Sequence, residues 1–461
     1  MIRNNKKLLD TFVGFREVVD LGDSFELALG LLCCRFMMSN KSWQDFVLLN
    51  EEKEATFSIL EKFLKSDLRQ RNRYKNENLD FLIPSFKTLI QLKNKDMDVK
   101  TLFDFVNKFN GDKKRMVAVS YSLLENFAEA VGRKYTSFLT PNFVANLMTK
   151  IACLDQREKI SISFYDFSMR SGQNILIMQN EIGKNVNLDF FGQEADNRNF
   201  RFSKMLTIMG VDTIHNVHLH RGDALGGDWP VNEEGNPRKF DVIVSDIPYS
   251  AHWIITAETK LDARYREVQA LPPKSKADYA YILHGIYHLK DHGTMVLRLP
   301  HGVLFRGGAE AKIRQFLLRE NLIDMVIGLP GNLDYSTSIP TILLVIKKSK
   351  KKHGILFIDG TSFFTKEISR DKSVSDAVNQ IIQICENHQM ISGLSRRVCY
   401  QEICNNNYNL NIARYVNSYE EQKRIPLAEI EKRISDIDVE LAHLETSYQK
   451  VLKEIYMDIN L

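Results

Sequence analysis

Between residues 160 and 358, short runs of β-branched and apolar residues alternate with segments of helical periodicity. Strands buried on both faces give continuous apolar runs of this kind, and parallel strands need a crossover segment, usually a helix, between them. The last two runs, 341–346 and 355–358, flank a short basic turn and predict an antiparallel hairpin. The pattern therefore predicts an α/β fold built on a mixed, mostly parallel sheet.

Two segments with helical patterns flank this alternation. Residues 1–130 carry apolar stripes at helical spacing and no strand–turn–strand signal, which predicts an N-terminal all-α domain. The alternating part then predicts a second domain over 131–370, followed by a C-terminal helical segment over 371–461. Within that segment, apolar side chains of residues 430–455 repeat at spacings of four and three, as in a coiled coil. Such a stripe needs a partner, either another chain's helix or the helix's own domain.

Bulk composition excludes several classes of protein. Lys and Arg outnumber Asp and Glu by only 62 to 58, so net charge does not predict nucleic-acid binding. The cysteines show no C-x-x-C pair and no metal-ligand spacing, so no metal is expected. No signal-type apolar core follows the first residues, and the longest apolar run, 27–38, is too short to span a membrane. We therefore expect a cytoplasmic protein.

The central apolar run, 240–244, leads into Asp246-Ile247-Pro248-Tyr249. An exocyclic amine on a planar base needs acceptors for its two N–H groups and a flat surface on which to stack. Asp246 offers a carboxylate, Ile247 a backbone carbonyl, and Tyr249 a ring. An ordinary Asp-x-Pro turn at a strand end would look the same. The tetrapeptide is therefore the candidate catalytic site, with the common turn as its alternative.

Three other predicted strands end at polar residues. A strand–turn–helix with glycine is typical of nucleotide-binding folds, and an acidic residue after the following strand is placed to bind ribose hydroxyls. An isolated loop carboxylate is the alternative for each acidic residue. The candidate residues are Asp166, Ser171 and Gly172 after the first strand, Glu194 after the second and Asp223 after the third.

Thr140 and Pro141 precede a predicted helix at 142–152, with Thr140 as the N-cap and Pro141 in the first turn. A helix N-terminus presents free N–H groups that favour a carboxylate. These two residues are therefore candidates for binding the carboxylate end of a cofactor, although the same pair also fits a simple helix start.

Taken in order, these motifs resemble the modification (methyltransferase) subunits of type I DNA restriction-modification systems. The resemblance extends over about residues 8–430. That family methylates N6 of adenine in DNA with an [Asn/Asp]-Pro-Pro-[Phe/Tyr] tetrapeptide, in which Ile247 replaces the first Pro here. The segments that carry the resemblance are Ser137 to Pro141, Phe191 to Glu194, Asp246 to Tyr249, Ala277 to Gly285 and Thr294 to Gly308.

The resemblance implies a Rossmann-like methyltransferase sheet and an adenine-specific DNA methyltransferase that flips its target base. S-adenosyl-L-methionine is the implied cofactor, and Thr140-Pro141 and Asp223 match the family's contacts to it. Double-stranded DNA and a separate DNA-specificity subunit are the implied partners, the latter bound through the C-terminal heptad helix. A second copy of the chain and a nuclease/translocase subunit also belong to such complexes.

The glycine turn departs from the family's Asp-Pro-x-x-Gly-Ser-Gly-Gly. Arg170 replaces the first glycine and Gln173 the last. An arginine here is expected to fill the cofactor site or to require a strained φ. One alternative is therefore a catalytically degenerate assembly subunit of a DNA-binding complex, with impaired cofactor binding. A second is a stand-alone RNA adenine methylase, because such enzymes carry a tetrapeptide with an apolar residue at the position of Ile247.

Overall fold

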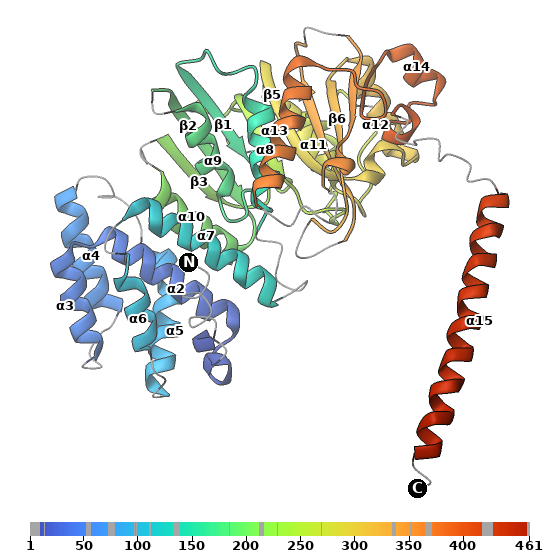
Figure 1. The fold of residues 1–461 in the computed structure, drawn as a ribbon. Helices are drawn as coiled ribbons and strands as arrows, with labels where there is room; N and C mark the ends of the chain where they lie inside the picture. The colour runs from blue at the N-terminus through green and yellow to red at the C-terminus, as the bar shows by residue number, and fades with distance from the viewer. Residues whose placement is uncertain are drawn as a thin grey trace. The chain divides into compact units, whose positions relative to one another are not determined.

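The structure is a computed structural model. The chain forms two compact units, Met1–Val416 and Asn417–Leu461, which are described separately (Figure 1). Ser137 and Phe138, the first residues of one motif, lie outside the described residues. The described residues are 10–12, 14–51, 57–71, 79–95, 97, 99–109, 112–131, 139–183, 185–211, 216–227, 229–268, 270–333, 338–350, 353–364, 371–416 and 427–458.

A mixed sheet organises the first unit, with the strand order β3-β2-β1-β4-β5-β7-β6-β8-β9. Neighbours from β3 to β5 are parallel, as are β6 and β8, whereas β7 is antiparallel to β5 and β6, and β9 to β8. The predicted mixed, mostly parallel sheet is therefore confirmed. The strands are β1 (Ser161–Asp166), β2 (Asn187–Glu194), β3 (Val217–Arg221), β4 (Phe240–Asp246), β5 (Leu289–Pro300), β6 (Ile323–Leu329), β7 (Thr341–Lys347), β8 (Ile355–Asp359) and β9 (Ser395–Val398).

The predicted hairpin of 341–346 with 355–358 is wrong. These runs form β7 and β8, but β6 lies between them in the sheet. Residues 341–346 of β7 are all buried, which requires covered faces on both sides and suits an inner strand better than a terminal hairpin. An apolar run therefore predicts a strand without identifying its neighbours.

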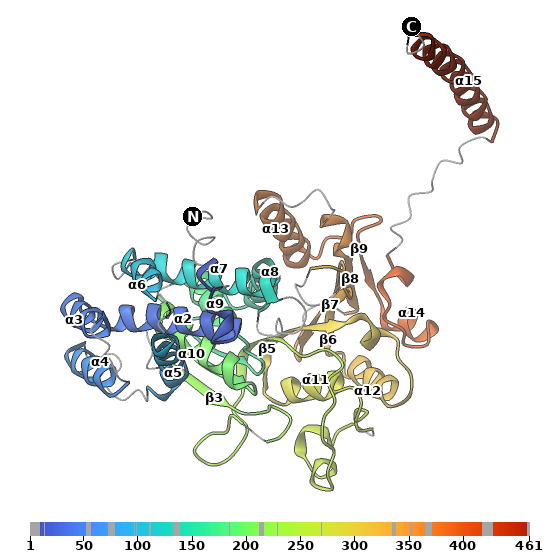
Figure 2. The same ribbon diagram turned by 90° about the horizontal axis from the view of Figure 1, so that it is seen from below.

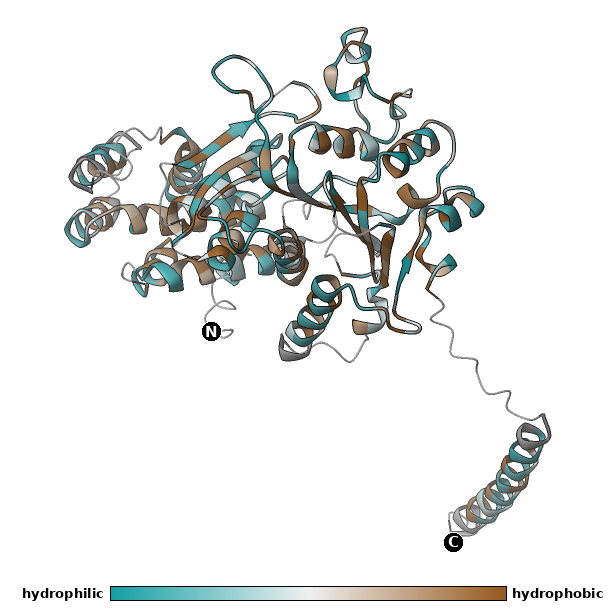
Figure 3. Ribbon diagram, turned by 90° about the horizontal axis from the view of Figure 1, so that it is seen from above, coloured by the Kyte–Doolittle hydropathy of each residue, from teal (hydrophilic) through white to brown (hydrophobic). Residues whose placement is uncertain are grey.

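Helices cover both faces of the sheet (Figure 2). One face shares a hydrophobic core with α8 (Asn142–Cys153), α9 (Gln173–Ile182) and α13 (Asp371–Asn387). The other face packs against α11 (Asp278–Tyr287) and α12 (Gly308–Arg319). The inner strands are largely hydrophobic as a result (Figure 3). A short helix, α14 (Tyr400–Asn405), follows β9 near the end of the first unit.

The N-terminal helices share a core with α10 (Asn197–Gly210), the helix between β2 and β3. Arg201 of α10 also pairs with the buried Glu26 of α2. The predicted helical character of this region is confirmed for its described residues, whereas the domain boundaries remain predictions. The helices are α2 (Leu21–Met37), α3 (Asn40–Glu51), α4 (Phe57–Arg71), α5 (Ile83–Asn94), α6 (Lys100–Asn107) and α7 (Lys113–Val131).

The second unit contains one long helix, α15 (Leu427–Asp458). The heptad residues whose side chains are described are 51% to 62% exposed; they are Ile434, Ile437, Leu441, Leu444, Tyr448 and Val451. The helix is as predicted, and its coiled-coil pairing remains a prediction. Among the described residues, no helix is both long enough and apolar enough to cross a membrane.

Candidate active site

Asp246 is the last residue of the central strand β4, and its side chain is 1% exposed. Thr140 Oγ1 donates a hydrogen bond to Asp246 Oδ2 over 2.8 Å, and the Tyr249 hydroxyl donates one to Oδ1 over 3.0 Å. Burial alone would raise the pKa of Asp246, but the charges of Arg170 and Arg298 and these two hydrogen bonds outweigh it and lower that pKa. Asp246 is therefore a buried, ionised acceptor.

The other residues of the tetrapeptide lie beside this carboxylate. Ile247 is fully buried, Pro248 is exposed, and Tyr249 is partly buried. The guanidinium of Arg298 lies over the Tyr249 ring, 5.7 Å from its centroid. The Tyr249 ring is thus held at two points: its hydroxyl donates to Asp246, and the buried Arg298 lies against its face.

Arg170 reaches the same tetrapeptide from the turn between β1 and α9. Its Nε donates to the backbone oxygen of Asp246 over 2.8 Å and its Nη2 to that of Ile247 over 3.3 Å. Its φ is +50°, a left-handed value that costs a non-glycine residue on the order of 1 kcal/mol. The strained φ expected from the sequence is confirmed.

Thr140 does not cap the helix as predicted. Pro141 occupies the N-cap position of α8, and no side chain caps this helix end. The hydroxyl of Thr140 instead donates a charge-assisted hydrogen bond to Asp246. The prediction for 142–152 as a helix is confirmed, with one further residue at its end.

Asp166 lies at the end of β1 and connects it to β4. It accepts hydrogen bonds from the hydroxyl of Ser245 over 2.7 Å and from Asn174 Nδ2 over 2.8 Å. Burial raises the pKa of Asp166 to about 7. Asp166 thus fixes the start of the glycine turn against the strand that carries Asp246.

The rest of the turn is shaped by close packing. Gly172 has φ +76°, and a Cβ there would lie 3.0 Å from the Cβ of Ser203 on α10. Ser171 beside it is 1% exposed. Gln173 Nε2 bonds to Asn142 at the start of α8, while its Oε1 is buried and has no partner among the described residues. The turn thus contains a buried acceptor, Gln173 Oε1, next to the start of α8. A polar ligand at this position would supply the donor that the acceptor lacks.

Glu194 ends β2 and is largely buried. Its Oε2 accepts from the backbone N–H of Arg170 over 2.8 Å and its Oε1 from that of Asp196 over 2.9 Å. Burial raises the pKa of Glu194, although these hydrogen bonds oppose the shift. A carboxylate has about four lone-pair sites, so Glu194 can accept two more hydrogen bonds from ribose hydroxyls.

Asp223 follows Gly222, whose backbone N–H donates to the backbone oxygen of Glu194 over 3.0 Å. Burial raises the pKa of Tyr281, and the negative charges of Asp223 and Glu194 add to that shift. The Tyr281 ring is stacked parallel to Phe167, with centroids 6.0 Å apart. The candidate residues after β1, β2 and β4 are thus linked through hydrogen bonds of Ser245 and Arg170. The side chain of Asp223 is linked to them through its charge, which acts on Tyr281.

Two further buried side chains at this site were not predicted from the sequence. Arg298, on β5, lies with Nη1 3.5 Å from Asp246 Oδ2 and is 1% exposed. Asp278, at the start of α11, accepts the backbone N–H of Ser250 over 2.8 Å and pairs with Arg306. A signal existed for Arg298, because a charge inside an apolar strand is costly to bury unless it is paired. An acidic residue at a helix start, such as Asp278, is common and carries no such signal.

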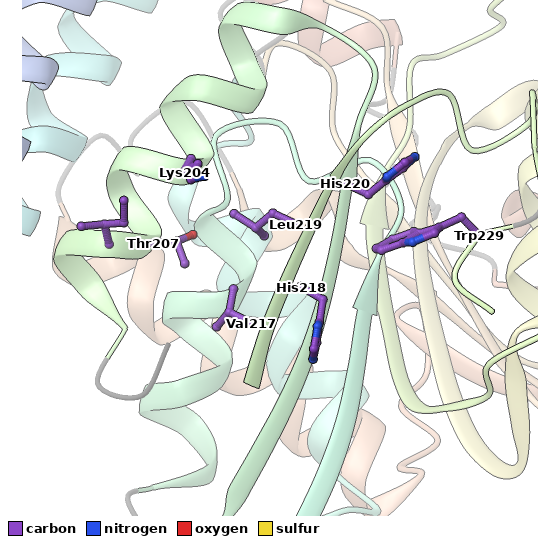
Figure 4. A pocket seen from close by; sticks show the side chains of 8 residues that line it. Lys204, Thr207, Val217, His218, Leu219, His220 and Trp229 are labelled. Atoms are coloured by element: carbon purple, nitrogen blue, oxygen red, sulfur yellow. The ribbon is translucent and has the colours of Figure 1, made fainter. Parts of the chain in front are cut away.

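A separate pocket lies at the edge strand β3 (Figure 4). It measures about 400 Å³, and His220 there stacks on Trp229 with ring centroids 4.8 Å apart. None of the predicted site residues lines this pocket. The candidate active site is therefore identified by its buried, hydrogen-bonded side chains and not by this pocket. The pocket is lined by Lys204, Thr207, Ile208, Val217, His218, Leu219, His220 and Trp229.

Known proteins share this architecture. Residues 114–424 match a family model described as N-6 DNA Methylase. The type I restriction enzyme MpnII methylase subunit of Mycoplasma pneumoniae is 27% identical over 441 residues, which cover 91% of this chain and 79% of that protein. The crystal structure of a type I restriction-modification methyltransferase subunit from Streptococcus thermophilus has a TM-score of 0.71 and 29% identity, over 90% of this chain and 99% of that one.

A third similarity concerns the fold alone. A structure described as showing complex assembly and conformational transition of the type I R-M system has a TM-score of 0.61 and 16% identity. The match covers 98% of each chain, and it therefore includes the N-terminal helices as well as the sheet.

Proposed function

The chain belongs to the N-6 DNA methylase family, and we propose that, as the modification subunit of a type I restriction-modification system, it methylates N6 of adenine in DNA with Asp246, Ile247, Pro248 and Tyr249. The family resemblance and the methyltransferase fold expected from the motifs are confirmed. The described relatives are methylase or methyltransferase subunits, which favours a catalytic chain over a degenerate assembly subunit.

One observation supports this assignment more than any other. The segment expected to bind a cofactor and the tetrapeptide expected to bind a base lie in direct contact, because Thr140 donates to Asp246. Methyl transfer between two substrates requires both to be positioned at adjoining sites. The carboxyl ends of β1, β2 and β4 supply these sites, where ligands of parallel α/β sheets generally bind.

The chemistry asked of the tetrapeptide is electrostatic. The lone pair of the adenine amine is conjugated with the ring, so the amine is a poor nucleophile. Asp246 Oδ1 and the Ile247 carbonyl would accept its two N–H groups and stabilise the positive charge that develops on nitrogen. Pro248 would fix the carbonyl, and Tyr249 would stack on the flipped base. The anionic state of Asp246 favours this role.

S-adenosyl-L-methionine would supply the methyl group as an electrophilic carbon on sulfur. Glu194 would accept its ribose hydroxyls, and Asp223 would lie near the adenine amine. Asp166, Ser171 and Gly172 would shape the turn. The orphaned Gln173 Oε1 and the spare lone pairs of Glu194 fit such a ligand. Thr140 and Pro141, at the start of α8, would face its carboxylate end.

Sequence recognition would come from a separate DNA-specificity subunit. The exposed heptad stripe of α15 fits a partner helix in that subunit, since an unpaired apolar stripe of this length is unfavourable in water. A second copy of the chain and a nuclease/translocase subunit would complete a restriction complex.

Calorimetric binding of S-adenosylhomocysteine to the purified full chain tests the cofactor assignment. We expect one site per chain, with affinity lost in Glu194→Ala. Retained affinity in that variant, or no binding by the unmodified chain, would contradict the assignment of the cofactor site.

A further inference from the structure

The guanidinium of Arg170 lies on the acceptors that the proposed function assigns to the target amine. Its Nη2 donates to the Ile247 carbonyl over 3.3 Å and lies 3.4 Å from Asp246 Oδ1. Its Nε donates to the Asp246 backbone oxygen over 2.8 Å, which anchors the group against the tetrapeptide. The side chain is 13% exposed, so it lies inside the site.

A guanidinium and an adenine amine present similar hydrogen-bonding groups. Each is planar, and each directs N–H donors toward a carboxylate and a carbonyl. Because Arg170 Nη2 lies 3.3 Å from the Ile247 oxygen and 3.4 Å from Asp246 Oδ1, an amine placed between the same two atoms would overlap it. We propose that the Arg170 side chain occupies the site of the target amine when no substrate is bound, and that it must leave this site before an adenine can enter. We call this side chain the gate. This inference rests on the proposed function and adds a regulatory step at the proposed active site.

The backbone of Arg170 connects this gate to the predicted cofactor site. Its N–H donates to Glu194 Oε2 over 2.8 Å, the carboxylate that would accept the ribose. Its φ of +50° is one that only glycine adopts without strain. A ligand bound to Glu194 would therefore lie next to Arg170, whose side chain closes the amine site. Cofactor binding and gate opening are coupled through one strained residue.

A purely structural role for Arg170 is less consistent with the surrounding contacts. Asp246 keeps a second buried cation, Arg298, 3.5 Å from Oδ2. It also keeps the hydroxyl donors of Thr140 and Tyr249. Removing the Arg170 side chain therefore leaves the carboxylate paired, whereas it frees the Ile247 carbonyl for a substrate.

The test compares the full chain, assembled with its specificity subunit, as the unmodified protein, Arg170→Gly and Arg170→Lys. Glycine suits the left-handed φ, so this variant is expected to fold. Lysine keeps the charge but cannot make both guanidinium contacts. Arg319→Ala, which removes an exposed ion pair on α12, is the control. The readouts are tritiated methyl transfer from S-adenosylmethionine to unmethylated genomic DNA, as a function of DNA concentration, and binding of S-adenosylhomocysteine.

If Arg170 is a gate, Arg170→Gly lowers the apparent KM for DNA by roughly tenfold, because the binding-competent state no longer has to be selected from a small population. Arg170→Lys shows a smaller change in the same direction, and Arg319→Ala shows none. An unchanged KM for DNA in Arg170→Gly, or loss of methyl transfer with cofactor binding intact, overturns the gate alone.

Two outcomes of the binding experiment separate the gate from the proposed function. If neither the unmodified chain nor Arg170→Gly binds S-adenosylhomocysteine, the proposed function fails, and the gate fails with it. If only Arg170→Gly binds it, the arginine closes the cofactor site permanently, which contradicts a gate that opens.

Discussion

The hydroxyl of Thr140 donates a 2.8 Å hydrogen bond to Oδ2 of Asp246, a residue 106 positions further along the chain. Both side chains are buried, so this bond fixes the start of α8 against the end of β4. It also supplies one of the donors that keep Asp246 ionised, against the effect of its burial.

Thr140→Val removes this donor and keeps the shape of the side chain. We expect the free energy of unfolding to fall by about 1–3 kcal/mol, because a buried carboxylate loses a hydrogen bond. Urea unfolding measures the change. Thr140→Ser retains the hydroxyl and should stay near the unmodified value. A loss in Thr140→Ser with none in Thr140→Val would show that the methyl group of Thr140 matters and the hydroxyl does not.

Asp278→Asn should separate positioning of the tetrapeptide from cofactor binding. The carboxylate of Asp278 holds the N–H of Ser250, next to Tyr249, and pairs with Arg306. We expect a lower rate of methyl transfer and an unchanged dissociation constant for S-adenosylhomocysteine. Glu320→Gln, which removes an exposed ion pair with Arg319, should change neither quantity. A parallel loss of cofactor affinity in Asp278→Asn would contradict this positioning role.

Much of the catalytic edge could be predicted from the sequence because its signals are local. The apolar run 240–244 lies within β4, and Asp246 and Glu194 end strands as expected. Apolar periodicity and strand-end polar residues depend only on neighbouring positions. The position of α8 followed from the same kind of signal.

The remaining features depend on contacts between distant residues. The hairpin of 341–346 with 355–358 failed because strand order is decided by pairing across the sheet, where β7 enters between β5 and β6. The hydrogen bonds of Thr140 and Arg170 to the tetrapeptide likewise have no local signal.

Asp166 should contribute a distinct dependence of stability on pH. Its pKa is about 7 in the folded chain, because of burial, against an ordinary value of 3.8. Between these two values the folded chain binds more protons than the unfolded chain, so stability falls as the pH rises through this window. Asp166→Asn cannot ionise and should lose this part of the slope. Urea midpoints at several pH values measure it, and an unchanged slope in the variant would contradict the raised pKa.

The heptad stripe of α15 should be required for assembly with the specificity subunit. Leu441→Asp places a charge on the stripe and is expected to abolish co-purification of the two subunits. Val439→Asp is the matched control: it is similarly exposed, and at about 100° per residue it lies on the opposite face of the helix. Co-purification that survives Leu441→Asp, or is lost equally in both variants, would argue against this interface.

The most direct test of the account is the rate of methyl transfer from S-adenosylmethionine to unmethylated DNA by Asp246→Ala, measured beside its affinity for S-adenosylhomocysteine. We expect a loss of about 100-fold or more in rate, because one acceptor for the target amine is gone. We also expect a folded chain with cofactor affinity retained. Methyl transfer at the rate of the unmodified protein would contradict the role of Asp246.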